Sequence, residues 1–191
     1  MPQQGVFIPS SAVSSDGVYK TILGKLKSAE PIPTDPKDSR LVLVNGRYYL
    51  CVPTKVMVRQ AENQGRIVSL DPGIRSFLTW FSQHDAGKLG VGSFGRIQRL
   101  CWHLDNLISK RTQVKGNRKR RLKLAENRMR HRIRDLIDEL HWKSARWLVD
   151  NYDIILLPSF ETAQMACAGK LRSKSVRMLM SFAHYRFQNR L

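Results

Sequence analysis

Two acidic residues each follow a short apolar run, and they stand 90 residues apart in the chain. Asp71 closes the run Ile67–Leu70 just before a Pro-Gly pair, and Glu161 stands shortly after the run Ile154–Leu157. An acid at the end of a strand lies at the rim of its sheet, where carboxylate oxygens can hold a hard divalent cation such as Mg²⁺ or Mn²⁺. Enzymes that break phosphodiester bonds use such acids as metal ligands.

Each acid has a simpler explanation when it is taken alone. Asp71 could be an ordinary turn residue, and Glu161 could be an acid favoured by the dipole at the start of a helix. If the two apolar runs are neighbouring parallel strands, however, their ends coincide and the carboxylates repel unless cations lie between them. The pairing favours Asp71 and Glu161 as catalytic metal ligands of a two-metal hydrolysis.

The charge balance points to a polyanionic partner. The chain has 33 Lys and Arg against 15 Asp and Glu, a formal net charge of +18. A membrane surface is the competing polyanion, but no apolar stretch approaches the ~18 residues of a membrane span. We therefore expect nucleic acid and no membrane as the partner. The three cysteines lack paired spacing and the five histidines lack ligand spacing, so no zinc is expected.

The basic residues concentrate between Lys110 and Arg134, where Glu126 is the only acid. A solvated helix face normally mixes both signs, and that explanation remains open. A one-signed face is better explained by phosphate contacts, which release counterions. The candidate nucleic-acid contacts, in this region and beyond it, are Lys110, Arg111, Lys115, Arg118, Lys119, Arg120, Arg121, Lys123, Arg128, Arg132, Lys170, Arg172, Lys174 and Arg186.

The elements that position these residues alternate between strand and helix signals. Residues 1–40 are rich in chain breakers and are predicted to be irregular. An Asn-Gly pair between the runs 41–44 and 48–52 predicts a hairpin. The run Ile67–Leu70 is predicted to pair antiparallel with Ser76–Ser82, followed by a short third strand near the glycines of 87–92. The unbroken apolar run 152–157 is typical of an interior strand covered on both faces.

The middle and the end of the chain show helical spacing. Apolar residues predict two helices, over 97–108 and 122–147, joined near Gly116, and a last amphipathic helix over 176–187 with Ser173 as its cap. The tryptophans of the two long helices are expected in the core. The pattern predicts an α/β fold in which a basic two-helix insertion, residues 94–150, interrupts a mixed sheet. The domains predicted are residues 1–62, irregular and β, and residues 63–191.

Four segments in order resemble one family. Leu70–Phe77 and Leu157–Met165 are similar to the first and second RuvC motifs of the transposon-encoded TnpB proteins and their Fanzor relatives. Leu171–Arg177 and Ala183–Phe187 resemble the segment that follows. The resemblance covers roughly residues 40–191. The residues of these segments are nearer to those of Fanzor-like and related TnpB sequences than to those of the commonest bacterial forms.

The resemblance implies an RNase H-like (RuvC) fold and RNA-guided cleavage of DNA, with Asp71 and Glu161 as two of three metal-holding acids. The partners implied are a guide RNA and a target DNA, and the first 62 residues would be the end of a recognition barrel. The zinc ribbon and the third acid of the family have no counterpart in the chain, so we expect little cleavage by the chain alone. The expected location is intracellular: cytoplasm or nucleoid in a prokaryote, nucleus in a eukaryote.

A second hypothesis is a basic RNA-binding protein without catalysis, of the ribosomal type. Composition does not separate the two hypotheses. The strand-end acids do, because a purely structural RNA binder has little use for carboxylates that face its polyanion.

Overall fold

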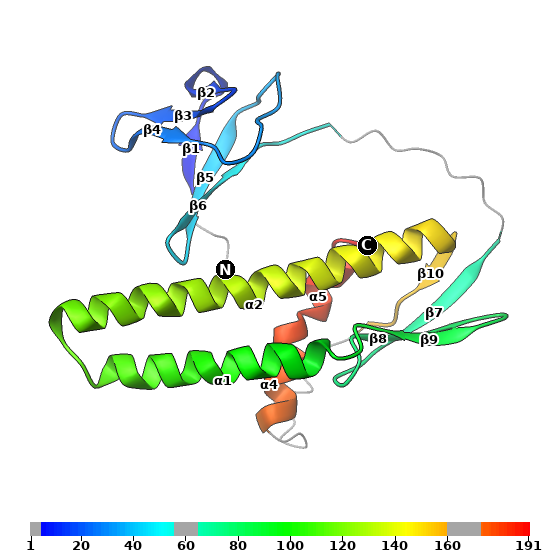
Figure 1. The fold of residues 1–191 in the computed structure, drawn as a ribbon. Helices are drawn as coiled ribbons and strands as arrows, with labels where there is room; N and C mark the ends of the chain where they lie inside the picture. The colour runs from blue at the N-terminus through cyan, green and yellow to red at the C-terminus, as the bar shows by residue number, and fades with distance from the viewer. Residues whose placement is uncertain (1–4, 56–64, 160–172) are drawn as a thin grey trace. The chain divides into compact units, whose positions relative to one another are not determined.

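The computed structural model describes residues 5–55, 65–159 and 173–191, and it shows a mixed α/β protein (Figure 1). Contacts divide the chain into two compact units, residues 1–60 and residues 61–191. The first unit holds six strands and a 3-10 turn, Ser10–Ala12: β1 (Val6–Ile8), β2 (Val13–Ser14), β3 (Gly17–Lys20), β4 (Gly24–Lys27), β5 (Ser39–Val44) and β6 (Arg47–Cys51).

The prediction that residues 1–40 are irregular is wrong, because β1 to β4 and the start of β5 lie there. The strands form two antiparallel three-stranded sheets, β1-β5-β6 and β2-β3-β4. Buried Ile8, Val18 and Leu41 make their common core. Strands of two to four residues are too short to show the alternation by which sequence reveals a strand.

The hairpin predicted at Asn45-Gly46 is confirmed by the pairing of β5 with β6. Its two loop residues both have positive φ, 50° at Asn45 and 88° at Gly46. Two such residues in a two-residue loop match the right-handed twist of the strands, and Asn followed by Gly adopts them at least cost.

The second unit is built on one four-stranded sheet with the order β10-β7-β8-β9. β7 pairs antiparallel with β8, as predicted, and parallel with β10, in the register Ile67 to Ile154. The condition under which Asp71 and Glu161 were expected to act together, that their strands are parallel neighbours, is thereby met. The strands of this sheet are β7 (Ile67–Pro72), β8 (Leu78–Ser82), β9 (Ala86–Leu89) and β10 (Ile154–Leu156).

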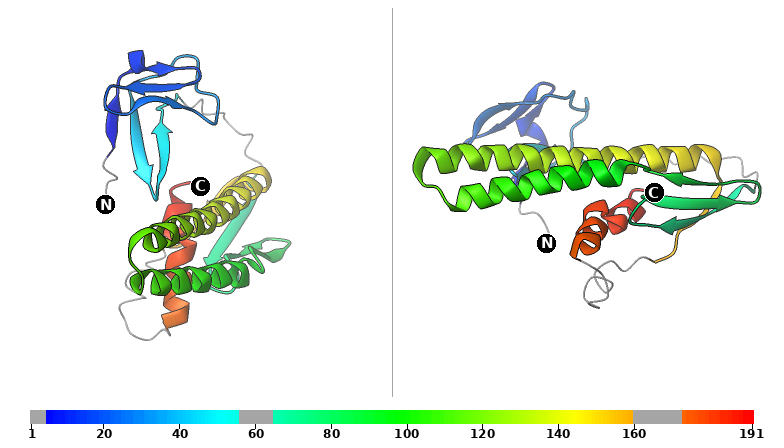
Figure 2. Two further views of the ribbon diagram at one scale, coloured as in Figure 1. Left: turned by 60° about the vertical axis from the view of Figure 1, so that its left-hand side comes forward. Right: turned by 60° about the horizontal axis from the view of Figure 1, so that its bottom comes forward.

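One face of this sheet is covered by helices. Along β7, Val68 and Leu70 are buried while Ser69 and Asp71 between them are exposed. The buried residues join one core with side chains from the four helices that the structure describes. These helices are α1 (Ser93–Thr112), α2 (Gly116–Asn151), α4 (Ser173–Phe182) and α5 (His184–Gln188), and Figure 2 shows α1 and α2 as a long hairpin.

The strand β10 differs from its prediction as an interior strand. Among the described residues it pairs with β7 alone, so it lies at the edge of the sheet. Ile154 and Leu156 point to the uncovered face and are 39% and 53% exposed. Within β10 only Ile155 packs against the core beneath the helices, so the continuous apolar run does not mean burial on both faces of the sheet.

The predicted last helix is two helices. Ala183 adopts the left-handed conformation, with φ 49° and ψ 52°, between α4 and α5. The apolar spacing continues through this break, because Phe182 and Phe187 both enter the core, and it could not reveal the change of direction. In the described parts of the chain, no helix is both long enough and apolar enough to cross a membrane.

Candidate functional site

Asp71 lies near the end of β7 on the uncovered face of the sheet. Its partner on β8 is Thr79, and Lys88 of β9 follows in the same cross-strand row. The carboxylate is exposed, and no hydrogen bond or ion pair to another residue of the described chain engages it. An oxygen ligand so placed suits a hard divalent cation.

The turn that follows Asp71 is held by hydrogen bonds. The amide of Gly73 donates to the carbonyl of Phe77 at 3.1 Å, and the amide of Phe77 donates to the carbonyl of Leu89 at 3.0 Å. His184 of α5 donates from Nε2 to the carbonyl oxygen of Gly73 at 3.2 Å. The backbone beside Asp71 is therefore fixed from β9 and from the C-terminal helices.

A stack of three rings lies beneath this turn. Phe77 lies between His141 and His184, with ring centroids 5.1 Å and 5.0 Å apart. Nε2 of His141 donates to the carbonyl of Phe182 at 2.7 Å. Burial disfavours the charged form and lowers the pKa of both histidines from 6.5 to about 4. Both rings are neutral at pH 7, which suits their places in an apolar core.

Glu161 lies outside the described residues, five positions beyond the end of β10. Because β7 and β10 are parallel, the chain leaves both strands at the same end of the sheet. The strands that lead to the two acids are therefore neighbours in the sheet.

Two other acids near β10 are already engaged. Asp153 accepts hydrogen bonds from the guanidinium and the amide of Arg66, and Asp150 accepts one from Arg146 at 2.8 Å. Asp153 also lies at the opposite end of the pair of β7 and β10. It is level with Arg66, five residues before Asp71, and five residues of extended strand span roughly 16 Å. Asp153 is therefore out of reach of a cation at Asp71.

Within the described ranges, no group of three His, Cys, Asp or Glu side chains could hold a metal ion. Asp71 supplies one ligand of the type that Mg²⁺ and Mn²⁺ prefer. A set of three such ligands that includes Asp71 would need at least one residue from beyond the described ranges, where Glu161 lies.

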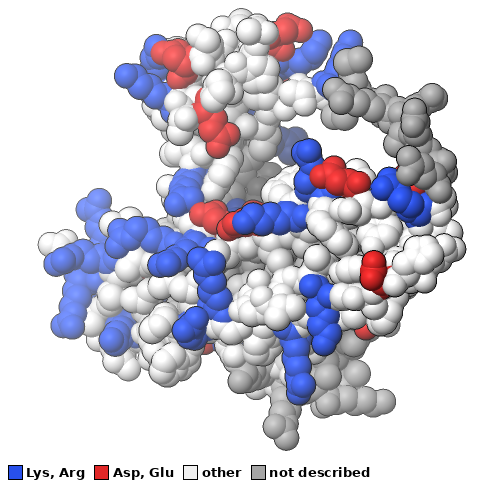
Figure 3. Space-filling view, turned by 45° about the vertical axis from the view of Figure 1, so that its right-hand side comes forward, with Lys and Arg blue, Asp and Glu red and all other residues white. Residues whose placement is uncertain are grey.

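The predicted nucleic-acid contacts of the basic region gather around the far end of the α1–α2 hairpin, where Figure 3 shows Lys and Arg clustered. All of them within 110–132 are exposed except Arg111, which is half-buried. Lys170 and Arg172 lie outside the described residues, as does the side chain of Lys174. We call the exposed set from Lys110 to Arg132 the basic tip.

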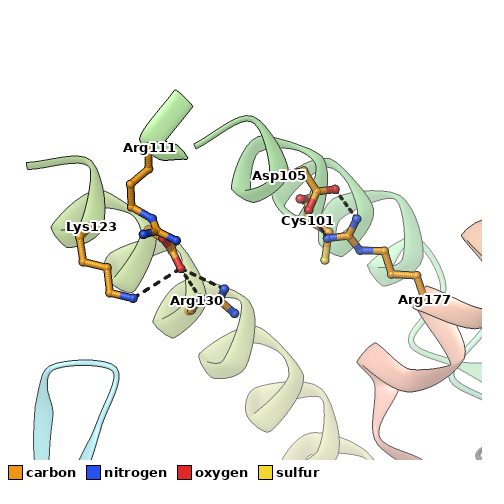
Figure 4. A network of polar contacts seen from close by, with 7 residues as sticks. Cys101, Asp105, Arg111, Lys123, Arg130 and Arg177 are labelled. Carbon is orange, nitrogen blue, oxygen red and sulfur yellow. Dashed lines mark hydrogen bonds and ion pairs between the residues drawn. The ribbon is translucent and has the colours of Figure 1, made fainter. Parts of the chain in front are cut away.

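The only acid between Lys110 and Arg134 holds the two helices together. Glu126 is 2% exposed and forms ion pairs with Arg111 of α1 and with Arg130 and Lys123 of α2 (Figure 4). Burial opposes its ionisation, but the hydrogen bond from Arg130 and the charges of the three cations outweigh burial and lower its pKa. Arg111 and Lys123 therefore have structural partners as well as their predicted role.

Arg186 is also paired. Its guanidinium bonds the carboxylate of Asp138 on α2, which Arg190 contacts at 2.9 Å. This ion pair fastens α5 to α2. Neighbouring Tyr185 is 71% exposed, whereas Phe187 is buried.

The tryptophans of the helices correct a sequence prediction. Trp102 and Trp142 were expected in the core but are 64% and 58% exposed, and Trp147 alone packs against it. The sequence held a signal that was missed: Trp102 is flanked at helical spacing by Gln98, Arg99 and Asp105, which are all polar.

Comparison with known proteins finds relatives in giant viruses of protists and algae. The chain is 22% identical to a TnpB-like protein of Acanthamoeba polyphaga mimivirus, over 90% of this chain and 35% of that protein. It is 25% identical to a protein of Paramecium bursaria Chlorella virus 1 named "putative transposase", over 93% of this chain and 42% of that protein. No family model matches. The chain thus spans between a third and a half of the length of these relatives, and the matches include most of its N-terminal unit.

Proposed function

We propose that this chain, a relative of TnpB-like proteins that it matches over 90% of its length, is a nucleic-acid-binding part of a transposon-associated, RNA-guided DNA endonuclease. A ribosomal-type RNA-binding role gains no support from these relatives. The strand pairing of β7 with β10, which brings the segments before Asp71 and Glu161 side by side, is the observation that carries the proposal.

The sheet is the reason for proposing an RNase H-like, RuvC-type fold. The strand β7 carries Asp71, and β8 and β9 follow it as antiparallel strands. After a helical connection, β10 pairs with β7 in parallel, which gives the order β10-β7-β8-β9. The hairpin of α1 and α2 lies within that connection and provides the basic tip. Asp71 at the end of β7 is the first metal-holding acid in this account, and Glu161 is the second.

The residues of the chain have separable roles. Asp71 offers an oxygen ligand on the open face of the sheet, and the turn beside it is fixed through Gly73, Phe77 and His184. Mg²⁺ or Mn²⁺, when bound, supplies charge stabilisation and a metal-activated water for phosphodiester hydrolysis. The basic tip binds phosphates without reading bases. Sequence choice is delegated to pairing between a guide RNA and the target DNA.

The test uses a chimera, in which this chain is followed by the remainder of the mimivirus TnpB-like protein. With a guide RNA and Mg²⁺ we expect cleavage of a matched DNA, whereas the 191-residue chain alone should bind nucleic acid with little or no cleavage. Asp71→Ala in the chimera should abolish cleavage. Asp85→Ala is the matched control, because Asp85 is an exposed acid in the β8–β9 turn at the other end of the same sheet.

Cleavage that survives Asp71→Ala would place the metal site elsewhere. Efficient metal-dependent cleavage by the 191-residue chain would contradict the account as well, because Asp71 and Glu161 would then have to suffice without the third acid of the family.

A further inference from the structure

A groove of about 450 Å³ lies between α1 and α4, on the second unit and away from both Asp71 and the basic tip. Residues from α1 form one wall, and residues from α4 form the other. The side chains that matter to its chemistry are Gln98, Arg99, Trp102, Asp105, Arg177 and Met178.

Trp102 is the unusual residue of this groove. It stands on the polar side of α1, 64% exposed, and its only ring neighbour within the described chain is the adjacent His103, tilted by 47° at 5.8 Å. Most of this indole lies in water, so packing against the core does not explain a tryptophan at this position. A flat exposed aromatic beside cations is the arrangement on which nucleic-acid bases stack.

The groove also carries a fixed polar pair. The guanidinium of Arg177 bonds both carboxylate oxygens of Asp105, and its Nη2 donates to the carbonyl of Cys101 at 3.4 Å (Figure 4). Both side chains of this pair are 44% exposed. The pair is neutral as a whole, and its solvent-facing atoms can offer both a donor and an acceptor to a ligand.

The remaining charge of the groove is positive. Arg99 is exposed next to Trp102, and no other described residue forms an ion pair with it. Beneath the indole, Cys101 and Met178 are buried and provide an apolar floor. These features match one nucleotide. The apolar floor, the aromatic face and the donor–acceptor pair suit its base, and the cation of Arg99 suits its phosphate.

We propose that this groove binds an unpaired base of a single-stranded nucleic acid, with Trp102 as the stacking platform and Arg99 against the adjoining phosphate. The proposal rests on the nucleic-acid binding proposed above and adds a second contact to that of the basic tip. A base inside a duplex cannot enter, because its faces are already stacked and its edge is already paired. The groove therefore distinguishes an opened strand from a closed one.

The experiment measures the affinity of the full 191-residue chain for a fluorescent oligothymidylate and for a duplex of equal length, at several salt concentrations. Stacking on one aromatic residue is lost in Trp102→Ala, so single-strand affinity should fall about 5- to 100-fold with an unchanged salt slope. Duplex affinity should stay as in the parent chain. Trp102→Phe should keep most of the single-strand affinity.

The control is Trp142→Ala, which removes the exposed tryptophan of α2, over which Arg190 lies at 5.1 Å from the ring centre. This variant should bind both ligands like the parent chain. An oligonucleotide with 5-iodouracil should crosslink to Trp102 on irradiation, which identifies the site without relying on the loss of function.

The outcomes separate this proposal from the previous one. If the chain binds no nucleic acid, both proposals fall. If it binds, but Trp102→Ala matches the parent chain or weakens the duplex equally, the stacking site is refuted while nucleic-acid binding stands. A crosslink confined to the basic tip would refute the groove as well.

Discussion

Ile67 and Ile154 are direct partners in the parallel pair of β7 and β10, although 87 residues separate them in the sequence. The hydrogen bonds between the amides of Asp153 and Ile154 and the carbonyl of Arg66 begin this pair. The chain therefore leaves β7 at Asp71 and leaves β10 toward Glu161 at the same end of the sheet. The helical hairpin of α1 and α2, which lies between these strands in the sequence, carries the basic tip.

The buried ring stack predicts an acid-sensitive fold. In the unfolded chain both histidines bind protons near pH 6.5, whereas in the native chain the pKa values of His141 and His184 are lowered to about 4 by burial. The unfolded state binds more protons in this window, so stability should fall as the pH drops from about 6.5 to about 4. The loss is at most about 3 kcal/mol for each ring.

Urea unfolding between pH 4.5 and 7.5 measures this slope. His184→Phe removes one titrating ring and should make the slope clearly shallower. His84→Gln, at an exposed position of the β8–β9 turn, should leave the slope as it is. Equal slopes in the parent chain and His184→Phe would refute the neutral stack.

The buried acid of the hairpin predicts a large effect of a small change. Glu126→Gln leaves Arg111, Lys123 and Arg130 close together without their anion. Loss of one partner of a buried ion pair typically costs about 3–5 kcal/mol. We expect a fall of several degrees in Tm by circular dichroism.

Glu139→Gln is the matched change on the same helix. Its carboxylate is 53% exposed and its ion-pair partner among the described residues is Lys143, so its loss should lower the Tm much less than the loss of the Glu126 carboxylate. If the two variants melted alike, the interhelical role of Glu126 would be wrong.

Two glycines near the start of α1 should respond oppositely to alanine. Gly90 has φ 71°, and a Cβ there would lie 2.7 Å from Cβ of Phe77 and 2.9 Å from Cδ1 of Leu140. Gly90→Ala should destabilise the second unit by about 1–3 kcal/mol. Gly95 lies inside α1 with nothing within 4 Å, so Gly95→Ala should stabilise by up to about 1 kcal/mol. Chemical denaturation of both variants checks the pair, and a Gly90→Ala variant as stable as the parent chain would contradict the packing around Gly90.

The basic tip predicts a salt-dependent affinity. Replacing Arg118, Lys119, Arg120 and Arg121 with Gln removes four exposed cations. If each contacts a phosphate, the slope of log affinity against log salt should become shallower by about 3. Lys143→Gln with Arg146→Gln is the control, because both cations are already paired on α2. A slope unchanged by the four substitutions in a filter-binding titration would return the tip to the solvated-face interpretation.

The sequence predicted the elements whose signals are local. The Asn45-Gly46 turn, the helical spacing of α1 and α2, and the antiparallel step from β7 to β8 all follow from neighbouring residues. The short strands of the first unit were not predicted, because two to four residues are too few to show the alternation of a strand. The exposure of Leu156 was not predicted because an apolar residue does not reveal whether another element covers it, whereas the polar neighbours of Trp102 at helical spacing do indicate its exposure.

The site was predicted only in part for a similar reason. The adjacency of β7 and β10 could be stated as a condition for Asp71 to act with Glu161, but only tertiary structure could meet that condition. The engagement of Asp153 by Arg66, and of Glu126 by cations from two helices, depends on contacts between distant residues. No spacing rule in the sequence encodes such contacts.

The most direct test of the central claim asks whether Asp71 and Glu161 hold the same cation. Mn²⁺ binding to the 191-residue chain can be followed by the loss of the free-ion signal in electron paramagnetic resonance, for the parent, Asp71→Asn, Glu161→Gln and the double variant, with Asp85→Asn as the control. Each single variant should weaken Mn²⁺ binding about tenfold or more, since even outer partners of metal ligands cost that much. The account predicts that the double variant is little weaker than either single one, because one shared site is lost once. Additive losses, or a parent chain whose Mn²⁺ binding ignores both substitutions, would contradict it.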